Sequence, residues 1–122
     1  MKYLLLFCGT PVDLEAWEAM SDEERVQKRA KAAQLMARYP SQLRRATGLQ
    51  LPHTITSVHV GMEGQPLVTD GPFLEGTEVI GGYAELEVAD LDEALQFARE
   101  WVADGPGHPV VEIWPIVEQY HA

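Results

Sequence analysis

The feature that most constrains the fold is the apolar run that opens the chain, Tyr3–Cys8. A run that is apolar at every position, rather than at alternate positions, is typical of a central strand covered on both faces. It is too short for a signal peptide and lacks an Ala-x-Ala cleavage site. We therefore predict a buried strand over Lys2–Cys8 and a sheet that other elements cover.

Helical segments follow this strand. A short helical turn is predicted over Asp13–Met20, and the capping box Ser21–Glu24 starts a long helix that runs to about Tyr39. We expect this helix to bury one apolar stripe, formed by Val26, Ala30, Ala33 and Ala37 with Met36 beside it. A further turn is expected over Ser41–Ala46. A last helix begins at Asp90, which has Glu93 at the capping-box position.

The remaining strands complete a β-α-β-β-α-β order. They are predicted at Thr54–Gly61, at Pro66–Thr69 after a hairpin turn, at Val79–Val88 and at Val110–Val117. This order indicates an α+β, ferredoxin-like domain with an antiparallel sheet and helices on one face. At 122 residues the chain is expected to be a single domain over 1–122.

Alternation along the strands predicts one apolar face and one mixed face. The mixed face carries Tyr83, Glu85, Glu112, Trp114 and His59. Exposed aromatic side chains on a bare sheet indicate an interface. Two such sheets packed face to face would form a homodimer and enclose a largely apolar cleft suited to a small-molecule ligand. The alternative is a monomer whose sheet faces water.

Charge and cysteine content narrow the function classes. A net charge of −10 argues against nucleic acid as a partner, because phosphate binding needs a basic surface. Seven of the nine basic residues lie between positions 25 and 45, either as a solvated helix face or as a strip that meets an acidic ligand or subunit. No apolar run reaches the length of a membrane span. A single cysteine fits a reducing compartment, so a cytoplasmic location is expected.

Three motifs carry a family resemblance. The segments Val68–Phe73, Gly81–Tyr83 and Ala89–Ala94 resemble the YCII-related or DGPF domain family. The resemblance implies a ferredoxin-like fold that dimerises into an α+β barrel, and some relatives in the wider superfamily are isomerase- or dehydrochlorinase-like enzymes. DGPF proteins are often encoded beside sigma factors, which implies a link to signalling. The His–Asp dyad of the YCII branch is not carried over, because the predicted helix 22–39 contains no histidine.

Two residues are the acid–base candidates. Asp70 either presents a carboxylate at a cleft or only bonds the amides of its own turn. His59 either moves a proton near pH 7 or is only a hydrogen-bonded side chain. The candidate ligand-binding residues are Gly71, Phe73, Tyr83, Glu85 and Trp114.

These residues predict a small-molecule-handling protein with its cleft on the mixed sheet face. Any catalysis would be cofactor-independent acid–base chemistry of the isomerase or lyase type. No spacing of Cys and His resembles a metal site, so neither metal nor cofactor is expected. One alternative is a non-catalytic ligand-sensing or regulatory module. Another is a protein-interaction module that binds its partner through the basic residues at positions 25–45.

Overall fold

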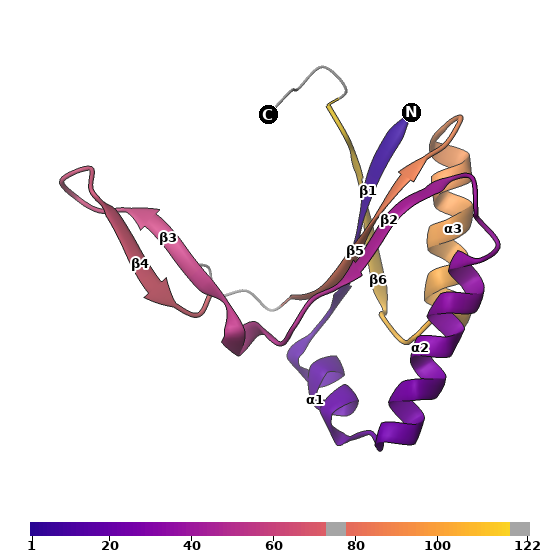
Figure 1. The fold of residues 1–122 in the computed structure, drawn as a ribbon, viewed down its shortest axis with the longest axis horizontal. Coiled ribbons are helices and arrows are strands. Elements are labelled where there is room, and N and C mark those ends of the chain that lie inside the picture. Colours follow the sequence, from indigo (N-terminus) through magenta and orange to yellow (C-terminus); the bar gives the residue numbers. More distant parts are fainter. Residues whose placement is uncertain (73–77, 118–122) are drawn as a thin grey trace.

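A four-stranded antiparallel sheet forms the body of the protein in a computed structural model, which describes residues 1–72 and 78–117 (Figure 1). Its strand order is β2-β5-β1-β6. The strands are β1 (Lys2–Gly9), β2 (Leu43–Gly48), β5 (Val79–Glu87) and β6 (Val110–Pro115). Because β1 pairs with both β5 and β6, the prediction that the opening apolar run is a central strand is confirmed. The described chain covers only one of its two faces, and Leu4 and Leu6 on the other face are only partly buried.

Helices cover one face of this sheet. They are α1 (Pro11–Ala19), α2 (Asp22–Met36) and α3 (Leu91–Asp104). Figure 1 shows α2 and α3 side by side along the sheet, with α1 at its lower end. The buried core lies between the sheet and these helices and consists mainly of Tyr3, Leu5, Phe7, Leu35, Ala84, Leu86, Ala94, Phe97 and Trp101. The predicted α+β architecture with an antiparallel sheet is therefore confirmed. Within the described ranges, no helix combines the length and the apolar character that crossing a membrane requires.

The predicted helix starts are confirmed by their caps. The Ser21 hydroxyl accepts the Glu24 amide at 3.1 Å, and Asp90 accepts the Glu93 amide at 3.1 Å. The short first helix begins at Pro11, two residues earlier than predicted, because Thr10 and Asp13 form a capping box of their own.

The second strand of the main sheet was predicted at the wrong place. Leu43–Gly48, which overlaps the helical turn predicted over Ser41–Ala46, is the edge strand β2 and pairs with β5. Only its first residue is partly buried, so the segment shows no apolar alternation from which a strand could be recognised.

The segment predicted as that strand forms a separate hairpin instead. β3 (Thr56–Val60) pairs with β4 (Pro66–Asp70) in a two-stranded sheet, and the short 3₁₀ helix η1 (Pro52–Thr54) precedes them. Figure 1 shows this hairpin reaching away from the main sheet. The predicted turn between the strands is confirmed: the Gly61 amide donates to the Gln65 carbonyl at 2.7 Å.

The buried stripe of α2 was also predicted wrongly. Val26, Ala30, Ala33 and Ala37 are all exposed. The helix packs through Leu35, with Ala32 and Met36 beside it. Larger side chains bury more apolar area than alanine does, and their position on the helix therefore decides which face meets the sheet.

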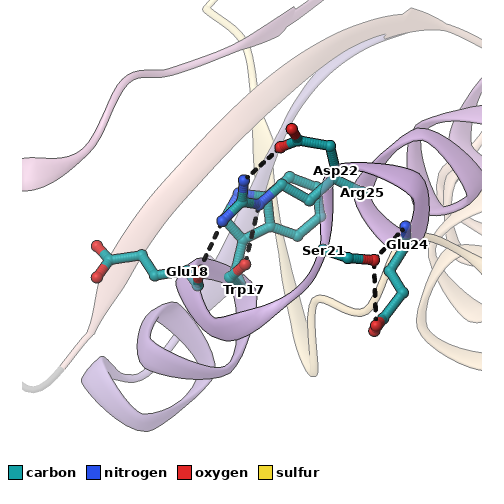
Figure 2. Close-up of polar contacts among 6 residues, drawn as sticks. All are labelled: Trp17, Glu18, Ser21, Asp22, Glu24 and Arg25. Carbon is teal, nitrogen blue, oxygen red and sulfur yellow. Dashed lines mark hydrogen bonds and ion pairs between the residues drawn. The ribbon is translucent and has the colours of Figure 1, made fainter.

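Arg25 joins α1 to α2 (Figure 2). Its Nε donates to the Trp17 carbonyl at 3.1 Å and its NH2 donates to the Glu18 carbonyl at 2.7 Å, while Asp22 holds its NH1 at 3.2 Å. These carbonyls belong to the last turn of α1, and the Trp17 carbonyl also accepts the Met20 amide at 3.2 Å. Because α1 has no buried residue, this contact contributes strongly to its position.

Replacing Arg25 with methionine is expected to lower the free energy of unfolding by about 1 kcal/mol, since charge-assisted bonds to two carbonyls are lost from a partly exposed site. Amide hydrogen exchange should increase in α1 more than in α3. The control is Lys31→Met, at an exposed position of α2, the helix that also carries Arg25. Equal exchange in α1 of both variants would show that Arg25 does not hold that helix.

Candidate functional site

The residues predicted for the site fall on two separate parts of the structure. His59 and Asp70 lie on the β3–β4 hairpin, whereas Tyr83, Glu85 and Trp114 lie on the four-stranded sheet. One copy of the chain therefore does not place the hairpin residues on the mixed face of the main sheet, contrary to the expectation for His59. Phe73, also predicted to bind ligand, lies outside the described residues.

Gly71 has the turn geometry that its residue type suggests. Its φ of +88° lies in the left-handed region that favours glycine. Its amide donates to the Ile55 carbonyl at 2.6 Å and its carbonyl accepts from the Ser57 hydroxyl at 2.7 Å. Gly71, which belongs to the Val68–Phe73 motif, thus closes the base of the hairpin. Asp70 beside it is exposed.

The sheet face away from the helices, called the open face below, has the mixed composition expected. Leu4 lies opposite Glu85 and Trp114, and Leu6 lies opposite Tyr83 and Glu112. The Trp114 side chain is 54% exposed, and its indole N–H donates to Glu112 at 3.3 Å. The open face therefore presents an aromatic surface without a cover from the described part of the chain.

A cleft of about 790 Å³ lies on the opposite side of the sheet, among α1, α2, the ends of β2 and β5, and the loop before β6. Its walls are largely apolar and include Phe7, Trp17, Met36 and Trp101. Four of its lining side chains are ionisable: Asp13, Lys28, Arg29 and His108. An apolar cleft with a few polar groups is typical of a small-molecule site. This is not the mixed face, where strand alternation predicts such a cleft.

His108 is the ionisable side chain best fixed in this cleft. Its Nδ1 accepts the indole N–H of Trp101 at 3.3 Å, and its ring stacks on Phe7 with centroids 5.7 Å apart. Burial lowers its pKa below the ordinary 6.5, which keeps the imidazole neutral at pH 7. Because Nδ1 is the acceptor, the hydrogen bond assigns the proton of the neutral ring to Nε2.

Gly81 makes room for that nitrogen. A Cβ at position 81 would lie 2.8 Å from His108 Nε2, closer than side-chain atoms approach one another. The glycine of the Gly81-Gly82 motif therefore accommodates a histidine ring.

Asp13 adds a charged carboxylate to the same cleft. The Thr10 amide and hydroxyl donate to its Oδ2 at 2.7 and 2.8 Å, and these bonds lower the pKa of the carboxyl group. Its charge favours the protonated form of His108, but burial outweighs this effect and the histidine pKa remains low. Neither residue was predicted from the sequence. Asp13 looked like the start of a helical turn, and His108 looked like part of a Gly/Pro loop. Their proximity arises only when α1 and the loop fold over the sheet.

The lowered pKa of His108 predicts a pH-dependent stability. Below pH 6.5 the unfolded chain binds a proton at this histidine that the folded chain resists, so the free energy of unfolding decreases as the pH falls toward the folded pKa. Urea unfolding between pH 7.5 and 5 should therefore show a steeper loss for the wild type than for His108→Gln. Parallel curves for the two proteins would contradict the assignment.

A second group of ionisable side chains lies beside β1 and β6. Ligand atoms of Cys8, Glu78 and Glu112 are within 4.8 Å of one another, a spacing that would accommodate a metal ion. Burial, and then the charges of Glu112 and Glu78, raise the pKa of the Cys8 thiol. The thiol is therefore protonated at neutral pH, whereas metal binding requires a thiolate. This group does not by itself indicate a metal site.

Two comparisons with known proteins bear on this chain. A sequence model of the YCII-related domain matches residues 1–117. An uncharacterized protein of Rhizobium meliloti is 30% identical over 116 residues, which cover 95% of this chain and 92% of that protein. Neither description names a reaction or a ligand.

Proposed function

The chain belongs to the YCII-related family, and from that premise and the cleft geometry we propose that it acts on a small molecule by cofactor-independent proton transfer. The observation that carries the proposal is the neutral His108, which lines a largely apolar cleft and whose ring is fixed through Nδ1 by the Trp101 bond, with Nε2 beside Gly81. A neutral imidazole donates a hydrogen bond to an oxygen that gains negative charge, as in the enolisation of a carbonyl compound.

Asp13 is the partner of His108 in this proposal. Its ionised carboxylate lines the same cleft and accepts the proton that leaves carbon, while His108 donates to the carbonyl oxygen. Returning the proton to another atom completes an isomerisation, and loss of a leaving group completes an elimination. Both reactions fit the isomerase or lyase class that the sequence suggests.

The enol–keto conversion of phenylpyruvate, followed by ultraviolet absorbance, tests this proposal. The wild type should accelerate the conversion over buffer, and His108→Gln should lower kcat/KM by about a hundredfold or more, the lower end of general acid–base effects. Gly48→Leu should also inactivate the protein. Gly48 lines the cleft, and an added Cβ meets no atom within 4 Å, so a leucine would occupy the cleft without displacing a neighbour. Ala33→Leu, on the exposed side of α2, is the control. Equal rates for wild type and both cleft variants would exclude this site.

Ligand sensing without turnover is the second candidate for the same cleft. α1 lines the cleft yet buries none of its residues, so a bound molecule would tighten a helix that is otherwise held by few contacts. Ligand-induced protection of α1 amides without any turnover would favour this regulatory function, which also accommodates the implied link to sigma-factor signalling.

A homodimer is part of the proposal. The strand order supports a ferredoxin-like description, and the open face with its exposed Trp114 suits the face-to-face packing of a dimeric α+β barrel. Val58, Val60 and Val68 are exposed on the hairpin, whose two strands alone would be marginally stable in water. Packing against a second copy would bring His59 and Asp70 toward the partner's sheet, where the predicted residues Tyr83, Glu85 and Trp114 lie.

Sedimentation equilibrium of the wild type and Trp114→Lys tests the dimer. We expect a dimeric wild type and a monomeric variant, because a charge at the centre of an apolar interface is costly to desolvate. A monomeric wild type would remove this part of the proposal.

A cytoplasmic setting also belongs to the proposal, since the free thiol of Cys8 suits a reducing compartment.

A further inference from the structure

We infer that the ligand of the cleft is a small planar carboxylate, held by Lys28 and Arg29 of α2. This inference rests on the proposed function for the location of the site and adds the chemical class of its ligand. The chain carries a net charge of −10. The cleft nevertheless has two basic side chains, Lys28 and Arg29, against one carboxylate, Asp13. With His108 neutral, the lining has an excess of one positive charge, which matches a monoanion.

Neither basic side chain is neutralised by a neighbour in the described residues. The ion pairs found there join Arg25 to Asp22, Arg38 to Glu100 and Arg44 to Glu87. Lys28 and Arg29 are thus the cations that the described ion pairs leave available to an anion at this cleft. Lys28 is half-buried at the cleft wall, whereas Arg29 is exposed.

Arg29 is oriented by an aromatic ring. Its guanidinium carbon lies 5.5 Å from the centroid of the Trp17 ring. A guanidinium stacked on an aromatic face keeps its N–H groups, which lie in its own plane, available for other partners. Two parallel N–H donors match the two oxygens of a carboxylate, and this bidentate pairing is stronger than a single neutral hydrogen bond.

The rest of the lining indicates a flat and apolar body for this ligand. Phe7, Trp17 and Trp101 contribute aromatic side chains to the walls. A volume of about 790 Å³ is within the range of small-molecule sites. Asp13 repels a carboxylate, so the anionic end of the ligand is directed toward α2 and its other end toward His108.

Isothermal titration with trans-cinnamate, its neutral amide and phenyl phosphate tests this inference without requiring turnover. Cinnamate should bind wild type at least tenfold more tightly than the amide, the effect expected for one charge-assisted contact. Arg29→Gln and Lys28→Gln should each weaken cinnamate binding about tenfold and leave the amide unaffected. Lys31→Gln, which removes the same charge from an exposed position of α2, should bind like the wild type.

Several outcomes would overturn the inference. Equal affinity for cinnamate and its amide would show that charge is not recognised, and tighter binding of phenyl phosphate would assign a phosphate ligand instead. An equal loss in Lys31→Gln would reduce the effect to general electrostatics, and no binding of cinnamate would remove the ligand class. Failure of the phenylpyruvate assay with selective cinnamate binding retained would refute the proton-transfer proposal alone.

Discussion

Trp101→Ala is expected to lower the free energy of unfolding by about 3–5 kcal/mol, the usual loss when a buried tryptophan is truncated. The side chain is 3% exposed and stacks on Phe7 with ring centroids 4.1 Å apart. It also contacts the ring of Phe97 and donates the hydrogen bond that fixes His108. Because small domains are stable by only about 5–15 kcal/mol, urea unfolding should show a large shift of the midpoint.

Trp101→Phe separates packing from hydrogen bonding. The variant keeps an aromatic ring against Phe7 but removes the indole N–H, so Nδ1 of His108 loses its donor. We expect a smaller loss of stability than in Trp101→Ala and a rise in the pKa of His108, since the bond that favoured the neutral ring is gone. Titration of the histidine by NMR measures this change. A Trp101→Ala variant within 1 kcal/mol of wild type would contradict the central position assigned to this side chain.

The second large effect is expected at Gly82. A Cβ at this position would lie 2.8 Å from the backbone oxygen of Thr47, which belongs to the paired strand β2. A backbone atom cannot rotate away as a side chain does, so Gly82→Ala should separate β2 from β5 locally. We expect a loss of about 1–3 kcal/mol in the free energy of unfolding, typical of overpacking. Because Thr47 and Gly48 line the cleft, ligand affinity should fall as well.

Gly48→Ala is the matched control for Gly82. The two glycines are paired across β2 and β5, but an added Cβ at Gly48 meets no atom within 4 Å. Its effect on stability should stay within about 0.5 kcal/mol, as for most exposed substitutions. Similar losses in the two variants, measured by urea denaturation, would indicate a general intolerance of strand substitutions rather than a steric contact with Thr47.

The elements predicted correctly are those whose signals are local in the sequence. The apolar run of β1, the cap at Asp90 and the turn closed by Gly61 and Gln65 each depend on residues close together in the chain. The edge strand β2 was missed because strand pairing, rather than an apolar pattern, defines it. The buried face of α2 was wrong because regular alanine spacing was preferred over the larger Leu35.

The cleft was the least predictable part of the molecule. Asp13 and His108 are 95 positions apart in the sequence, and neither lies in a recognisable motif. What brings them together is the packing of α1 at the end of the sheet and the stacking of His108 on Phe7. Strand alternation had favoured His59 and its turn position had favoured Asp70; the catalytic roles of both stay predictions.

The β3–β4 hairpin has a consequence for how this chain tolerates change in length. Its ladder joins its own two strands, and the described bonds at its base close within the segment from Ile55 to Gly71. An insertion at the tip, at Gly64, would therefore leave the registration of the main sheet unaltered. Its tip therefore offers an attachment point for a fluorescent label or a short epitope.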